Sequence, residues 1–256
     1  MINVMDYPLL VFLLAVLAMS LFSWIGGLVR QLPGQDKEVD DVFRVIEGGT
    51  LTLLALIVGF TFSMAVDRYN LRKGREEVEA NTIGTEYLRA GLLPAAEATK
   101  LRALISSYLE QRILFYTTRG PRSTVEQIET KTAQLQNEMW SVAQAAGTAQ
   151  PNQVVALAVS GLNDAIDAAG YTQAAWKNRI PFEAWGLMLA MTLCISAMIG
   201  YHVRATRSKF ALFFVLPFTL SISYFMIAEL DSPNGGMIRV SPYNLIGLAE
   251  SLRAPP

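Results

Sequence analysis

Hydroxyl and bulky apolar side chains share one face of an uncharged stretch, residues 48–66. The four side chains on that face follow one another at intervals of four, four and three residues: Thr52, Leu56, Phe60 and Ser63. Hydroxyls can replace part of an ion's water shell, and apolar side chains can close a narrow path by expelling water. This face is therefore a candidate lining for an ion pathway. The alternative is that the hydroxyls bond to carbonyls four residues earlier or join neighbouring helices.

A cluster of basic residues follows this stretch: Arg68, Arg72, Lys73 and Arg75. Rings of Arg or Lys favour anions at the mouth of a pore. The same residues could equally bind lipid headgroups or fix the orientation of the chain in a membrane. The cluster thus indicates either an anion vestibule or a headgroup contact.

Glu79, Asn81 and Gly84 come next on the same predicted helix. Small residues here allow a second helix to approach closely, so we expect these three to serve helix packing; the alternative is a ligand site. Glu79 can also pair with Arg75, which lies four residues earlier on the same face. Further along the chain, Asp231 precedes Ser-Pro and is typical of a turn or cap.

Several kinds of chemistry are excluded by the residues that the sequence lacks. A single cysteine, Cys194, rules out a disulfide within the chain and a cysteine-built zinc site. A single histidine, His202, rules out a multi-histidine metal centre and argues against a histidine triad. No phosphate-binding loop or dinucleotide motif is present, and a net charge of -1 gives no general basic field for nucleic acid. We therefore expect no enzyme activity, no cofactor, no metal and no nucleic-acid partner.

The elements that must position these residues are helices in a membrane. Charged residues make up only 17% of the 256 and hydrophobic residues 52%, with a mean hydropathy of +0.32. Four blocks contain no charged residue: 8–29, 48–66, 184–201 and 210–228. A helix needs roughly 20 apolar residues to cross the hydrocarbon core, and backbone inside lipid must be helical. The sequence predicts four transmembrane helices.

A block with nearly equal numbers of acidic and basic residues separates the second span from the third. We expect the second span to continue as a helix to about Pro94, followed by helices over 95–117, 123–146 and 152–177. The helix over 123–146 begins with Ser123 and Glu126, which fit a capping box. The predicted organisation is a first and second span (1–66), a soluble helical block (67–181), a third and fourth span (182–230) and a tail (231–256). A short helix is expected at 243–252.

The distribution of basic residues gives conflicting indications of which side of the membrane the soluble block faces. Arg204, Arg207 and Lys209 favour a cytoplasmic loop between the third and fourth spans, which puts the soluble block outside. The basic cluster after the second span favours the opposite orientation. Charge alone leans toward an outside soluble block.

Residues 57–70 read IVGFTFSMAVDRYN, and this stretch resembles the signature of the bestrophins. A Gly-Phe lies in the middle of the second span, small or polar residues follow, and an Arg with an aromatic residue marks the membrane exit. The chain is more similar still to the bacterial bestrophin-like domain family. That likeness includes Glu79-Ala80-Asn81, Gly84-Thr85, Tyr87-Leu88-Arg89, Arg179-Ile180-Pro181 and Asp231-Ser232-Pro233.

The resemblance implies a pentameric channel, mostly for anions, with four spans and a large cytoplasmic helical domain in each subunit. It implies that the second span lines the pore and that Thr52, Leu56 and Phe60 form a narrow neck. Thr52 departs from the apolar residue usual there, and no match to the acidic calcium clasp of animal members is present. The expected partners are the lipid bilayer, further copies of the chain and small inorganic anions, in a bacterial inner membrane. The alternative is a non-conducting membrane protein whose soluble helices bind or scaffold a partner.

Overall fold

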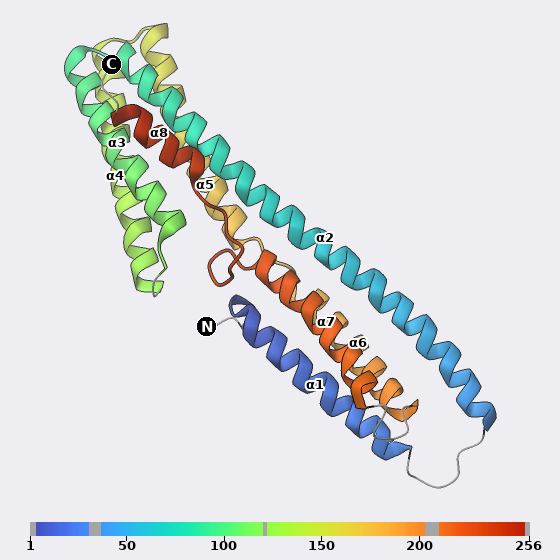
Figure 1. Ribbon diagram of the computed structural model, residues 1–256. Helices are drawn as coiled ribbons and strands as arrows, with labels where there is room; N and C mark the ends of the chain where they lie inside the picture. Colours follow the sequence, from blue (N-terminus) through green and yellow to red (C-terminus); the bar gives the residue numbers. More distant parts are fainter. Residues whose placement is uncertain (1–3, 31–36, 120–121, 203–209, 254–256) are drawn as a thin grey trace. The chain divides into compact units, whose positions relative to one another are not determined.

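Helices form all the regular secondary structure that the chain shows within residues 4–30, 37–119, 122–202 and 210–253, the part described by the computed structural model (Figure 1). The elements in chain order are η1 (Val4–Asp6), α1 (Pro8–Val29), α2 (Lys37–Arg89), η2 (Ala90–Leu92), α3 (Ala95–Thr117), α4 (Arg122–Ala149), α5 (Gln153–Lys177), α6 (Phe182–His202), α7 (Phe210–Asp231) and α8 (Tyr243–Arg253). The predicted all-α fold is confirmed. Arg204, Arg207 and Lys209, on which the orientation argument drew, lie outside the described residues.

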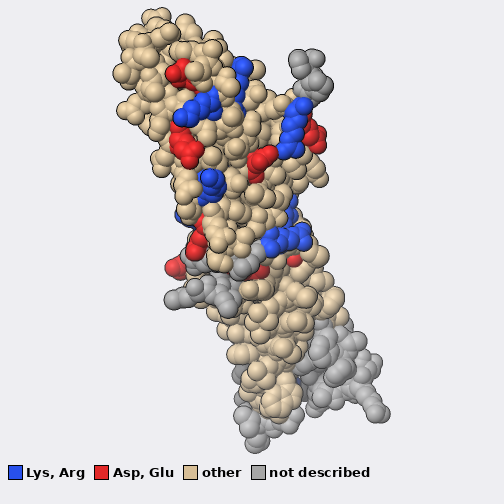
Figure 2. Space-filling model, turned by 90° about the vertical axis from the view of Figure 1, so that its left-hand side faces the viewer, with Lys and Arg blue, Asp and Glu red and all other residues tan. Residues whose placement is uncertain are grey.

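Three stretches of the described residues are long and apolar enough to cross a membrane. They are Pro8–Val29 and one window within each of Val42–Leu92 and Gln153–His202. Figure 2 shows the corresponding contrast, with charged side chains gathered over one part of the visible face and a wide area without them. The fourth predicted span coincides with α7, which has 22 residues, and its crossing of the membrane stays a prediction.

The chain divides into two compact units, and α2 contributes to both. The first unit contains Met1–Tyr69 and Arg179–Arg239, and the second contains Asn70–Asn178 and Val240–Pro256. The second span and the helix that follows it are one uninterrupted helix, as the absence of proline between them predicts. The C-terminal helix α8 belongs to the second unit, with α3, α4 and α5.

In the first unit, α1, α6 and α7 pack together with the first part of α2 around an apolar core. Met19, Ala65, Met188 and Ile227 are all fully buried there. Helices α1 and α6 approach closely at Gly200, where an added Cβ would strike the backbone of Ser23. Glycine is required at such a crossing because any side chain would force the two backbones apart.

In the second unit, α3 packs against α4, and α4 packs against α5. The core side chains follow the helical periodicity and are buried to within a few per cent: Leu101, Ile105, Leu109, Leu135, Met139 and Leu162. Helix α5 begins at Gln153, one residue after the expected start, and is capped by Asn152, whose side chain accepts hydrogen bonds from the backbone N–H groups of Val154 and Val155.

The capping box predicted for the start of α4 is wrong. Helix α4 begins at Arg122, so Ser123 already lies within it. An N-cap residue needs a non-helical backbone, and Ser123 does not have one. The predicted capping box with Glu126 is therefore not the start of this helix.

Candidate functional site

The four residues of the candidate ion pathway lie together on the exposed side of α2. Leu56 is 53% exposed and Phe60 63% exposed, and Thr52 and Ser63 are exposed beside them. The opposite side of the same helix carries Leu54, Thr61 and Ala65, which are buried in the first unit. The chain by itself therefore leaves a face of large apolar side chains and small hydroxyls uncovered.

The hydroxyls on α2 also make the local bonds that the alternative interpretation expects. Thr52 Oγ1 donates to the carbonyl of Gly48 at 2.9 Å, and Thr61 Oγ1 donates to the carbonyl of Ile57 at 2.8 Å. A threonine that bonds to its own helix presents its methyl group and its oxygen lone pairs outward. Thr52 thus keeps an acceptor on the exposed face.

The basic cluster does not have one common environment. Lys73 is exposed, Arg72 is only 1% exposed, and Arg68 and Arg75 are half-buried. The guanidinium of Arg75 lies over the ring of Tyr171, 5.0 Å from its centre. Of the four, Lys73 is the one that is exposed in the chain alone.

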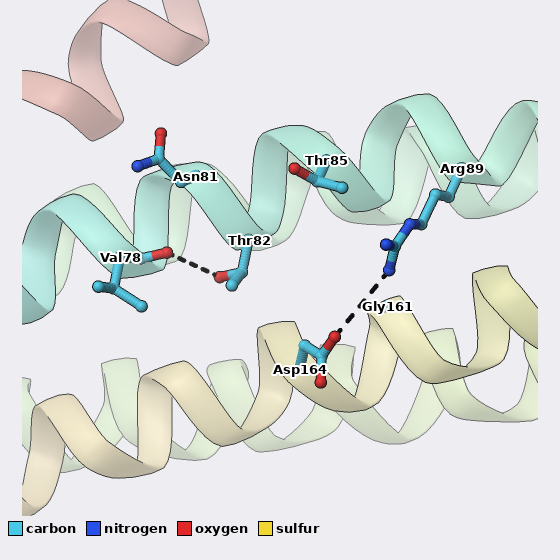
Figure 3. A pocket seen from close by; sticks show the side chains of 7 residues that line it. All are labelled: Val78, Asn81, Thr82, Thr85, Arg89, Gly161 and Asp164. Atoms are coloured by element: carbon cyan, nitrogen blue, oxygen red, sulfur yellow. Dashed lines mark hydrogen bonds and ion pairs between the residues drawn. The ribbon is translucent and has the colours of Figure 1, made fainter.

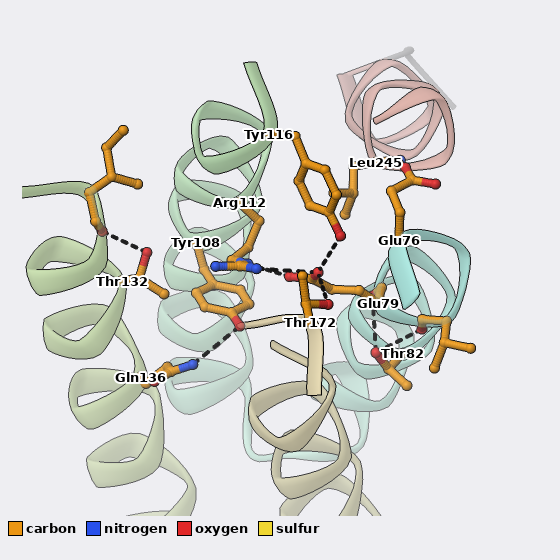
Figure 4. Close-up of polar contacts among 12 residues, drawn as sticks. Glu76, Glu79, Thr82, Tyr108, Arg112, Tyr116, Thr132, Gln136, Thr172 and Leu245 are labelled. Carbon is orange, nitrogen blue, oxygen red and sulfur yellow. Dashed lines mark hydrogen bonds and ion pairs between the residues drawn. The ribbon is translucent and has the colours of Figure 1, made fainter. Parts of the chain in front are cut away.

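A buried cluster centred on Glu79 joins three helices of the second unit (Figure 4). Arg112 of α3 forms an ion pair with Glu79 of α2, and neither side chain has any exposed surface. Tyr116 Oη donates to Glu79 Oε2 at 3.0 Å, and Thr172 Oγ1 of α5 donates to the same oxygen at 2.9 Å. The ion-pair partner of Glu79 is therefore Arg112 and not Arg75, the neighbour expected from sequence spacing.

The electrostatics of this cluster shift the pKa values of the residues around Glu79. Burial lowers the pKa of Arg112, but the adjacent Glu79 carboxylate outweighs that effect and raises it. Burial and the Glu79 charge raise the pKa of Tyr116 well above its usual range, so its hydroxyl remains a donor. Desolvation likewise raises the pKa of Tyr108 to about 12, and Gln136 donates to its hydroxyl at 3.3 Å.

Asn81 and Gly84 lie outside this cluster: Asn81 is exposed and Gly84 is half-buried on α2. Asn81 lines a cavity of about 230 Å³ between α2 and α5 (Figure 3), together with Val78, Thr82, Thr85, Arg89, Gly161 and Asp164. Gly84 faces α8, where an added Cβ would meet the side chain of Leu248 at 3.1 Å. Asn81 and Gly84 also line a second hollow together, beside Asn244 and Leu248 of α8, whereas Glu79 is buried in the cluster.

A second acidic residue of α2 holds the C-terminal helix. Glu76, 1% exposed, accepts hydrogen bonds at 3.0 Å from the backbone N–H groups of Asn244 and Leu245 at the start of α8. This contact could not be predicted from sequence, because Asn244 and Leu245 lie 168 and 169 positions after Glu76.

In the first unit, Arg179 joins the residue that ends α7 to the segment before α1. Its guanidinium donates to Asp231 at 3.0 Å and to Asp6 at 2.7 Å. Asp231 also accepts from the backbone N–H of Ile180 at 2.9 Å. The neighbouring carboxylates outweigh burial and raise the pKa of Arg179. Asp231 is thus the last residue of a helix and an ion-pair partner, a larger role than the turn residue that sequence indicated.

Comparison with known proteins assigns the chain to a family. The Bestrophin-like domain profile matches residues 12–245, and the chain belongs to the Bestrophin-like family. None of the curated proteins compared with the chain matches it. The bestrophin fold is known in general for anion channels rather than for enzymes.

Solved structures with the same fold come from a bacterial bestrophin homolog of Klebsiella pneumoniae. A single-residue variant of that homolog aligns with a TM-score of 0.66 at 12% identity, covering 93% of this chain and 97% of the other. A zinc-phased structure of the homolog aligns with a TM-score of 0.59 at 15% identity, covering 96% and 99%. The predicted likeness to bestrophins is confirmed at the level of family and fold.

Proposed function

We propose that this protein is an oligomeric membrane channel that passes small anions along a path lined by α2. The observation that carries the proposal is the exposed face of α2, on which Leu56 and Phe60 stand uncovered while Leu54 and Ala65 on the opposite side of the helix are buried. Large apolar side chains on such a helix need a covering surface, and copies of the same face arranged around an axis supply one. Membership of a family known for anion channels supports the same interpretation.

Each part of the α2 face has a role in this proposal. Leu56 and Phe60 form the narrowest part, where apolar walls hold back water until the path widens. Thr52 and Ser63 offer hydroxyl groups on either side of it. Lys73 attracts anions electrostatically at the mouth, and no metal or cofactor takes part. We propose a ring of five copies in a bacterial inner membrane, with the second unit in the cytoplasm.

Flux measurements on purified protein in liposomes test the proposal. Wild-type protein should pass halide, and Leu56→Ala and Phe60→Ala should conduct faster or with weaker selectivity because each removes part of the constriction. Leu17→Ala is the matched control, since Leu17 is a 66% exposed leucine on α1, outside the proposed path. Its flux should equal that of wild type.

The oligomeric state separates conduction from its alternative. Native mass spectrometry in detergent should find five copies, and a stable monomer would contradict the proposal. If folded oligomers of the wild type and of both widened variants all pass neither halide nor small cations, the protein is not a channel. The soluble helices would then be the place to look for a bound partner.

A further inference from the structure

Glu86 is a buried carboxyl group without a hydrogen-bond partner. It lies on the second-unit part of α2, its side chain is 1% exposed, and neither carboxyl oxygen has a partner. It differs in this from Glu76 and Glu79, whose oxygens accept several bonds each. An ionised carboxylate buried without donors is strongly disfavoured, so this environment favours a bound proton.

Gly161 of α5 lets the carboxyl group lie where it does. A Cβ at Gly161 would strike Glu86 Oε2 and would come within 2.6 Å of a guanidinium nitrogen of Arg89. The absent side chain therefore leaves room for one acid and one base from α2 side by side. Gly161 and Arg89, which lie against Glu86 in this way, also line the cavity of about 230 Å³ between α2 and α5 (Figure 3).

Two charged groups face Glu86, and they act on it in opposite directions. Arg89, one turn further along α2, favours the ionised form, and Asp164 of α5 disfavours it. Arg89 now lies toward Asp164, with 3.9 Å between Nη1 and Oδ2, which is too long for a hydrogen bond. Arg102 of α3 is directed elsewhere, since its Nε donates to the carbonyl of Tyr87.

We propose that Glu86 is a proton-binding switch at the contact between α2 and α5. With the proton bound, Arg89 faces Asp164 as in this structure. When the proton leaves for solvent, the carboxylate draws Arg89 to itself, Asp164 loses its partner, and the cavity changes shape. The switch depends on the second unit alone and does not require the protein to conduct.

The pH range follows from the environment of the carboxyl. Desolvation raises the pKa of Glu86 from 4.5 to about 8, against the smaller opposing effect of Arg89. The folded chain therefore keeps a proton that the unfolded chain releases between these two values. Stability of the second unit should fall as the pH rises through that interval and level off above about 8.

Infrared difference spectroscopy of the full chain in detergent measures this protonation directly. Wild type should show a protonated carboxyl band that is lost with a midpoint near pH 8, and Glu86→Gln should lack it. Glu77→Gln is the matched control because Glu77 is an exposed carboxylate on the same helix. That variant should keep the band and its midpoint.

Two further variants test the partner exchange even if Glu86→Gln fails to fold. Arg89→Gln should move the midpoint upward, because it removes the charge that favours ionisation, and Asp164→Asn should move it downward. Each shift should reach at least about half a pH unit, a threefold change in proton affinity. A midpoint below about pH 6, or one that neither variant moves, would overturn the proposal.

Discussion

The Oε1 atom of Glu76 accepts a hydrogen bond from the backbone N–H of Leu245 at 3.0 Å, so a side chain of α2 caps the start of α8. The first N–H groups of a helix have no partner within it, and a negative charge near them interacts favourably with the positive end of the helix dipole. Glu76 meets both needs and also accepts from the Asn244 side chain at 2.6 Å. One buried carboxylate therefore fixes the position of the C-terminal helix on the second unit.

Replacing this carboxylate by an amide should loosen α8. Glu76→Gln keeps the size of the side chain but removes its charge and one acceptor, so we expect a loss of about 1–2 kcal/mol in the binding of α8. Amide hydrogen exchange in residues 243–253 should quicken accordingly. Glu77→Gln, at the adjacent exposed position, should leave that exchange unchanged. Equal exchange in the two variants would show that Glu76 does not hold the helix.

The Glu79–Arg112 pair should be among the costliest to break in the second unit. Arg112→Met leaves a charged carboxylate fully buried, and we expect a loss of about 3–5 kcal/mol of stability. The exposed pair of Arg253 and Glu110, at 2.8 Å, provides a comparison. Arg253→Met should cost less than about 1 kcal/mol because solvent already screens that pair.

A double variant distinguishes the loss of the ion pair from the loss of packing as the cause of the lower stability. Glu79→Gln combined with Arg112→Met removes both charges, so it should recover part of the stability lost in Arg112→Met. Thermal unfolding in detergent, followed by circular dichroism, measures the stability of wild type, Arg112→Met, Arg253→Met and the double variant. A double variant less stable than the single one would argue against an uncompensated charge as the source of the loss.

The crossing of α1 and α6 should tolerate no side chain at Gly200. Gly200→Ala places a methyl group against the backbone of Ser23, and we expect at least about 2 kcal/mol of destabilisation or loss of folded protein. Gly186→Ala is the control on the same helix, since a Cβ there meets nothing within 4 Å. Detergent-solubilised yield and unfolding temperature should fall for Gly200→Ala and not for Gly186→Ala.

The contact of Arg179 with Asp231 should depend on charge more than on shape. Asp231→Asn preserves an oxygen for the backbone N–H of Ile180 but weakens the ion pair with Arg179. The Arg179 side chain is 21% exposed and the Asp231 side chain 1% exposed. We expect a loss of about 1–3 kcal/mol in the first unit. Glu183→Gln, an exposed carboxylate nearby in sequence, should change the unfolding temperature little. A similar shift in both would mean that the Arg179 pair contributes nothing specific.

The spacing of apolar residues and the positions of helix-breaking residues such as Pro94 explain why so much of the fold could be predicted from sequence. The uncharged run at 8–29 became α1 with the same bounds, and the segment after Pro94 became α3 over Ala95–Thr117 as expected. Both depend on neighbours within a few residues, which a single sequence displays. The face of α2 that carries Leu56 and Phe60 was likewise visible as a helical spacing.

The polar contacts could not be predicted because they depend on distant residues. Nothing near Glu79 marks Arg112 or Thr172 as its partners, and the local rule for helix pairs pointed to Arg75 instead. Glu86 looked like an ordinary surface residue, since one charged residue in a helix gives no indication of burial. Its environment is set by Gly161, 75 positions away, whose missing side chain has meaning only in the packed structure.

The separation of the partners of Glu79 bears on the lifetime of the folded chain. Its hydrogen bonds span 33, 37 and 93 positions, so long loops must close before the carboxylate meets all three donors. A carboxylate gains nothing by leaving water earlier than that. The cluster should therefore form after the folding transition state, where weakening it speeds unfolding and barely slows refolding. Glu79 then governs how long the second unit stays folded rather than how quickly it folds.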